Sequence, residues 1–144
     1  MTQKPILIVL SPYYKDISDM LVTGATVAVT QAGYAAEIIT VPGALEIPPA
    51  ISLAIVSERY TGYVALGCVL RGETTHYDTV CNESARGLMQ LATWHHAAIG
   101  NGILTCETEA QAIVRADPKQ GNKGGEAAIA AIRLAEIKQQ MEQA

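Results

Sequence analysis

Short apolar runs alternate along this chain with longer segments of helical periodicity, and this alternation restricts the fold more than any other feature of the sequence. Each apolar run has the length of one buried strand, whereas the segments between the runs repeat apolar residues at helical spacing. Strands that alternate with helices are typical of parallel βα units. We therefore expect strands over residues 6–10, 37–41, 63–70 and 97–105.

The segments between and after these runs predict five helices. After the first strand, Ile17, Leu21 and Ala25 fall on one helical face, and Gly33 ends that helix. Pro48 and Pro49 belong to the start of the second helix, where proline is tolerated. The second to fifth helices are expected at residues 45–59, 75–94, around 111–115, and 123–143. A glycine-rich lead-in marks the start of the last one. The last has a narrow stripe of small residues that allows close backbone approach.

These elements predict an α/β fold in which a four-stranded parallel sheet is covered by helices on both faces. The 144 residues suffice for one core and leave no room for two, so we expect residues 1–144 to form a single domain. In open parallel sheets, ligands bind beyond the carboxyl ends of the strands. The loop after each strand is therefore the place to search for chemistry.

Composition excludes several classes of protein. With 49% hydrophobic and 17% charged residues, the chain is not disordered and has enough apolar surface for a subunit interface. A net charge of -4 argues against a nucleic-acid or membrane-surface partner. No apolar run has the length of a membrane span, and the first residues do not resemble a signal peptide, so we expect a cytoplasmic protein. Cys68, Cys81 and Cys106 are widely spaced and read as buried apolar residues, not metal ligands.

The loops after the first two strands each hold a candidate binding residue. Tyr13 and Tyr14 are two of only seven aromatic residues in the chain. They either stack on a ligand or pack, one on the sheet edge and one on the surface. Glu46 follows the second strand among apolar neighbours. It either satisfies amides at a helix start or accepts hydrogen bonds from substrate hydroxyls.

Residues 71–76, after the third strand, read RGETTH and form the most informative segment. Gly72 permits a tight turn, and the following helix presents its amide end, so the segment can bind an anion. The alternative is an ordinary helix start that Thr75 caps while His76 is exposed. His76 is the only histidine at the carboxyl end of a strand. It is therefore the candidate for proton transfer near neutral pH.

The remaining charged candidates lie in the last third of the chain. Arg115 and Lys123 are suited to clamping a phosphate or carboxylate, although each is also an ordinary surface charge. His95 and His96 follow one another beyond a helix end with no third ligand near in sequence, so we expect no metal site. No nucleotide-binding glycine motif follows a strand, which argues against nucleoside triphosphates and nicotinamide cofactors.

Taken as a set, these motifs resemble the lumazine synthase family through nearly the whole chain. The segments that carry the resemblance are VPGALEIP at 41–48, ALGCVLRGETTHYD at 65–78, GILT at 102–105, QA at 111–112 with Arg115, and NKG at 122–124. The resemblance implies a flavodoxin-like three-layer sandwich, assembled into pentamers whose active sites are shared between neighbouring subunits. It also implies an enzyme of riboflavin biosynthesis.

The implied reaction condenses 5-amino-6-(D-ribitylamino)uracil with 3,4-dihydroxy-2-butanone 4-phosphate. The products are 6,7-dimethyl-8-ribityllumazine, phosphate and water, and no cofactor is needed. His76 is the implied proton carrier. The implied substrate-binding residues are Tyr13, Ala44, Leu45, Glu46, Val69, Leu70, Gly72, Glu73, Thr74, Asn101, Arg115 and Lys123. By position, Tyr13 stacks on the pyrimidine, Glu46 holds the ribityl chain, and residues 72–74 bind the phosphate with a neighbour's Arg115.

The chain departs from the family pattern at three places. It has Pro12-Tyr13-Tyr14 where Arg-Phe-Asn is common, Leu45 where an aromatic residue is frequent, and Asn101 where phenylalanine is frequent. The resemblance implies that many members carry an N-terminal segment that adds a strand to a neighbour's sheet. Few residues precede the first strand here, so we expect a pentamer or a pair of pentamers in preference to a sixty-subunit shell. A non-catalytic paralogue that binds flavin or lumazine in the same pocket is the alternative to an enzyme, and a flavodoxin-like redox or signalling domain is a third reading.

Overall fold

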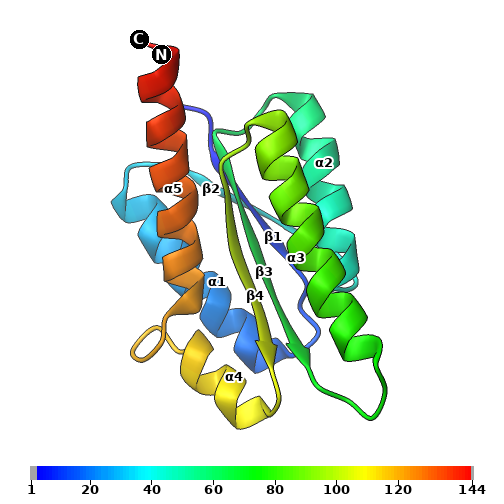
Figure 1. Cartoon of the computed structure of the whole chain (residues 1–144). Helices are drawn as coiled ribbons and strands as arrows, with labels where there is room; N and C mark the ends of the chain where they lie inside the picture. The colour runs from blue at the N-terminus through cyan, green and yellow to red at the C-terminus, as the bar shows by residue number, and fades with distance from the viewer. Residues whose placement is uncertain (1–2, 144) are drawn as a thin grey trace.

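The computed structural model describes residues 3–143 and contains a four-stranded parallel sheet in the order β2-β1-β3-β4. Its strands are β1 (Ile6–Leu10), β2 (Ala36–Thr40), β3 (Gly62–Leu70) and β4 (Ile99–Cys106). Its α-helices are α1 (Lys15–Gln31), α2 (Ile47–Ser57), α3 (His76–His95), α4 (Glu109–Ala116) and α5 (Lys123–Glu142). Helices α1, α4 and α5 cover one face of the sheet, and α2 and α3 cover the other (Figure 1). The predicted flavodoxin-like three-layer fold is confirmed.

Alternate residues of β1 face the two helical layers, and every residue of this strand is buried. Ile6, Ile8 and Leu10 pack in the core under α1, α4 and α5. Leu7 and Val9 pack in the second core, under α2 and α3. A strand with helices on both faces must be apolar at every position, which is why β1 reads as a continuous run in the sequence.

Helices α1 and α5 lie in close contact. Gly124 has no room for a side chain, because a Cβ atom there would overlap the carbonyl oxygen of Leu21 in α1. Ala128 and Ala131 continue the contact along α5 and are fully buried. The predicted narrow, small-residue face of the last helix is thus confirmed, and it brings α1 and α5 together over the sheet.

Several predicted boundaries were wrong. The second helix does not begin at residue 45: residues Ala44–Glu46 form a 3-10 turn, and α2 starts at Ile47 with the prolines in its first turn. Strand β2 begins and ends one residue earlier than expected, and β4 is shifted toward the carboxyl end. The start of α5 at Lys123, by contrast, is confirmed as predicted, and the helix ends at Glu142, one residue before the expected end. Gly33 does end α1, with a φ of +91° that favours glycine.

No helix within residues 3–143 combines the length and the apolar character needed to cross a bilayer. Of the three cysteines, Cys68 and Cys106 are buried as expected, whereas Cys81 is half-buried. The carboxyl ends of the strands lie at one edge of the sheet, and the loops that follow them meet there (Figure 1).

Candidate active site

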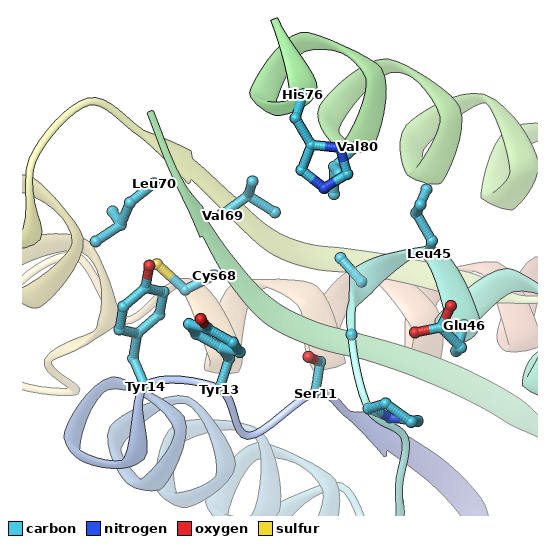
Figure 2. A pocket seen from close by; sticks show the side chains of 13 residues that line it. Ser11, Tyr13, Tyr14, Leu45, Glu46, Cys68, Val69, Leu70, His76 and Val80 are labelled. Carbon is cyan, nitrogen blue, oxygen red and sulfur yellow. The ribbon is translucent and has the colours of Figure 1, made fainter. Parts of the chain in front are cut away.

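A cavity of about 400 Å³ opens at the carboxyl edge of the sheet (Figure 2). Its walls come from four segments: the loop after β1, the loop and 3-10 turn after β2, the end of β3, and the first turns of α3. Ligand pockets of small-molecule enzymes begin at about this size. The cavity also lies beyond the carboxyl ends of the strands, where a parallel sheet of this kind predicts a ligand site.

Two tyrosine rings form the wall after β1. Tyr13 is 74% exposed, whereas Tyr14 is half-buried and packs against the core under α1. The two ring centroids are 4.9 Å apart with 70° between the ring planes, an edge-to-face contact. Both tyrosines line the cavity; Tyr14 packs and Tyr13 lies at the surface, as the packing alternative expected, and stacking on a ligand stays a prediction.

Glu46 lies on the far side of the cavity, at the end of the 3-10 turn (Figure 2). Its side chain makes no capping hydrogen bond to α2, so the helix-capping alternative was wrong. Ala44 and Leu45 line the cavity beside it. Among the residues that the structure describes, the Glu46 carboxylate has no hydrogen-bond or ion-pair partner, so it is available to accept hydrogen bonds from a ligand.

The end of β3 forms the floor through Val69 and Leu70, together with Cys68. Burial raises the pKa of the Cys68 thiol to about 12, and the nearby Cys106 and Glu109 add to the shift. Burial also raises the pKa of the Tyr14 hydroxyl, with Cys68 as the next cause. Both groups therefore stay neutral and offer no charge to a ligand at neutral pH.

His76 is the first residue of α3, and its imidazole projects into the cavity from the side opposite Tyr13 (Figure 2). Val80, one turn further along α3, lines the cavity below it. The Thr75 side chain makes no capping hydrogen bond, so that part of the alternative was wrong, whereas His76 is exposed as the same alternative expected. The Thr74 hydroxyl accepts a hydrogen bond from the His76 amide at 3.3 Å. Gly72, Glu73 and Thr74 are exposed in the loop that leads into α3, next to the cavity but outside its lining.

Three predicted binding residues do not reach this cavity within one subunit. Asn101 is exposed on β4, where its Oδ1 accepts a hydrogen bond from the Ile103 amide at 2.9 Å. The Arg115 guanidinium donates to the carbonyl oxygen of Gln111 in α4, and Lys123 pairs with Glu126 at the start of α5. Helices α4 and α5 cover the opposite face of the sheet from α2 and α3 (Figure 1).

Sequence reasoning did not name Ser11, Pro42, Gly43, Cys68 and Val80 as binding residues, although all five line the cavity. Ser11 follows β1 directly, and its amide donates to the Leu66 carbonyl oxygen at 3.0 Å. Its position at a strand end was a usable signal, whereas Cys68 and Val80 have the apolar character of core residues. Within residues 3–143, no cluster of three His, Cys, Asp or Glu side chains is suited to holding a metal ion.

Comparison with known proteins identifies the family. Residues 3–139 match the family described as 6,7-dimethyl-8-ribityllumazine synthase. A protein of that name from Novosphingobium aromaticivorans is 60% identical over 92% of this chain and 95% of its own length. Its counterpart in Zymomonas mobilis is 54% identical over 94% of this chain and 96% of its own.

A third relative, 6,7-dimethyl-8-ribityllumazine synthase 1 of Rhizobium meliloti, is 50% identical over 94% of this chain and 92% of its own length. These relatives carry the name of an enzyme, which gives the non-catalytic alternative no support. The motifs that led to the resemblance, at residues 41–124, all lie within the family match. The chain belongs to the 6,7-dimethyl-8-ribityllumazine synthase family of enzymes.

Proposed function

We propose that this chain is a cytoplasmic enzyme of riboflavin biosynthesis that condenses 5-amino-6-(D-ribitylamino)uracil with 3,4-dihydroxy-2-butanone 4-phosphate. The products are 6,7-dimethyl-8-ribityllumazine, phosphate and water. One observation carries the proposal: a single cavity brings together an exposed aromatic ring, an unpartnered carboxylate and a histidine at a helix start. These three groups match a flat ring, a hydroxylated chain and a proton-transfer step.

The pyrimidine substrate occupies the part of the cavity between Tyr13 and Glu46. Tyr13 is exposed enough to stack on a planar ring, and such contacts favour offset or edge geometry. The backbone of Val69 and Leu70, at the end of β3, reads the edge of the pyrimidine. Glu46, next to Ala44 and Leu45, accepts hydrogen bonds from the ribityl hydroxyls.

The phosphate substrate binds at Gly72, Glu73 and Thr74. These residues precede α3, whose first amide groups and helix dipole favour an anion. The loop is exposed, so a phosphate reaches it directly from solvent. Arg115 of a neighbouring subunit supplies the guanidinium that pairs with two phosphate oxygens.

His76 carries protons between the two substrates. The ring amine attacks the ketone carbonyl, and water leaves when the Schiff base forms. His76 then accepts a proton from the carbon skeleton as the phosphate leaves. It returns one during ring closure, when the ribitylamino nitrogen attacks the remaining carbonyl carbon and a second water leaves. Amine and ketone react without help, so holding them together in one cavity supplies much of the acceleration.

The site is completed by subunits of a homopentamer. Arg115, Lys123 and Asn101 lie outside the cavity of their own subunit and are therefore available to a neighbour's. Large apolar side chains on the outer surfaces of α2 and α3 support such an assembly, among them Leu53 at 75% exposed, Val56 at 80% and Trp94 at 71%. Side chains of this size gain from burial against another copy.

The test is to mix purified protein with both substrates and follow lumazine formation by absorbance against the spontaneous reaction. We expect a rate well above background that saturates in both substrates. A rate equal to background, with the pyrimidine still bound, would overturn catalysis and leave a binding protein. Heat-inactivated protein at the same concentration is the control.

A further inference from the structure

Tyr13 and Tyr14 are neighbours in sequence with different surroundings. Tyr13 is 74% exposed, so little of its ring is held by the protein. Tyr14 packs against the core under α1, and its backbone carbonyl accepts a hydrogen bond from the Ser18 amide at 2.8 Å in the first turn of that helix. One ring of the pair is therefore anchored in the core, and the other is mostly exposed, with the Tyr14 ring in contact with it.

The contact between them is specific in geometry. The ring centroids lie 4.9 Å apart and the planes meet at 70°, which is the favourable edge-to-face arrangement of two aromatic rings. The Tyr14 hydroxyl points toward the sulfur of Cys68 (Figure 2), which packs in the same core cluster. Tyr14 thus has a fixed orientation and presents a fixed surface to Tyr13.

We propose that Tyr14 is a positioning residue that holds the ring of Tyr13 in place over the cavity and so raises the affinity for the pyrimidine. This inference rests on the stacking role proposed for Tyr13. An exposed side chain loses rotamer freedom when it clamps a ligand, and that loss weakens binding. A neighbour that restricts the ring beforehand removes part of the loss.

The experiment is a double-mutant cycle with Tyr13→Leu, Tyr14→Leu and the double variant. The dissociation constant of 6,7-dimethyl-8-ribityllumazine is measured by calorimetry for each. We expect Tyr14→Leu to weaken binding about threefold to tenfold when Tyr13 is present, the range of a lost aromatic pair. In the Tyr13→Leu background it should have less than about a twofold effect, because the ring it positions is gone.

Two controls separate positioning from a structural role. Tyr14→Phe keeps the ring and should bind like the unmodified protein. The KM for 3,4-dihydroxy-2-butanone 4-phosphate should not change in Tyr14→Leu, since residues 72–74 do not touch this pair. If Tyr14→Leu does not fold, Tyr14→Met takes its place, because it fills similar space without a ring.

The outcomes are distinguishable. Equal weakening by Tyr14→Leu in both backgrounds would overturn the inference, because the effect would not pass through Tyr13. An unchanged affinity in Tyr14→Leu, with a clear loss in Tyr13→Leu, would overturn it and leave the proposed function intact. An unchanged affinity in Tyr13→Leu would overturn the stacking role itself, and the inference with it.

Discussion

The guanidinium group of Arg71 lies over the ring of Tyr77, with 4.4 Å between its central carbon and the ring centroid. The same group pairs with Asp78 at 3.5 Å and with Glu107 at 3.4 Å. Arg71 is the first residue after β3, whereas Tyr77 and Asp78 lie in the first turn of α3. These contacts therefore brace both ends of the loop that carries residues 72–74.

Replacing Arg71 tests whether this brace shapes the phosphate site. We expect Arg71→Met to raise the KM for the phosphate substrate about fivefold, because a cation over an aromatic ring and two exposed ion pairs together contribute about 1 kcal/mol. The affinity for the pyrimidine should change less. Steady-state kinetics with each substrate varied in turn gives the comparison.

Arg86→Met is the matched control, since the pair between Arg86 and Glu83 lies within α3, away from the loop. It should leave both KM values as they are. A similar rise in both KM values for Arg71→Met would show a general loss of structure and contradict the local role.

Removing the His76 imidazole should slow the enzyme without silencing it. We expect kcat of His76→Ala to fall by about 10²-fold, the usual contribution of one proton-transfer group, while turnover stays above the spontaneous rate. Proximity of the two substrates supplies the remainder. His95→Ala, at the far end of α3, should retain full activity. Complete loss of turnover with substrate still bound would contradict this division of labour.

A shared active site predicts complementation between subunits. Glu46→Ala and Arg115→Ala variants should each be impaired, because each lacks one side of every site. After subunits are exchanged at equal amounts, about one quarter of the sites combine an intact Glu46 with a neighbour's intact Arg115, so activity should rise toward that fraction. The rise is measured after dissociation and reassembly of the mixture.

Mixing Glu46→Ala with His76→Ala serves as the control. Both residues line the cavity of one subunit, so no mixed assembly restores an intact site. Recovery in this control, or none in the first mixture after proven exchange, would contradict a shared site.

The buried Cys68 thiol predicts a loss of stability in alkali. Its pKa rises from an ordinary value of 9.0 to about 12 in the folded chain, chiefly through burial. Above about pH 9 the unfolded state loses a proton that the folded state keeps, so stability that is complete below that pH falls as the pH rises toward 12. Thermal melts should show a shallower decline of Tm for Cys68→Val than for the unmodified protein.

Cys81→Val is the comparison, because burial raises the pKa of its half-buried thiol as well. Its effect on the slope should be smaller than that of Cys68→Val. Parallel decline of Tm in all three proteins would contradict the assignment of the alkaline instability to Cys68.

The close contact of α1 with α5 predicts that Gly124 does not tolerate a side chain. Gly124→Ala should lower the free energy of unfolding by about 3 kcal/mol, since the added Cβ atom overlaps the Leu21 carbonyl oxygen and the helices must separate. Gly72→Ala is the control for stability, because a Cβ atom there meets nothing within 4 Å. Denaturant titration measures both, and equal midpoints would contradict the contact.

Strand β1 was predicted at its observed bounds because burial on both faces leaves a continuous apolar signature, whereas the mostly exposed β2 was displaced by one residue. The start of α2 was not predictable, because residues 43–46 can form either a separate turn or the first turn of the helix. The prolines that follow are compatible with both arrangements. Sequence reasoning also assigned the wrong threonine to the start of α3. Thr74 and Thr75 carry the same hydroxyl group, so the sequence does not distinguish them, and in the structure the Thr74 hydroxyl accepts the hydrogen bond from the His76 amide.

Much of the candidate site was also predictable, because loops after parallel strands converge. Tyr13, Glu46 and His76 lie in different loops, and the structure brings them to one cavity. Cys68 and Val80 were missed because their side chains are apolar, and a lining residue of that kind looks like a core residue in a sequence. The placement of Arg115 beside a neighbour's cavity stays a prediction, because a single subunit contains no neighbour.

The direction of the parallel strands also determines which end of a subunit is suited to a fusion or to immobilisation. Strand β1 starts, and α5 ends, at the end of the sheet opposite the cavity (Figure 1). A fusion partner, affinity handle or solid support joined before Ile6 or after Glu142 is therefore held away from the cavity mouth. In engineering terms, cargo at either junction leaves the substrate entrance of its own subunit clear.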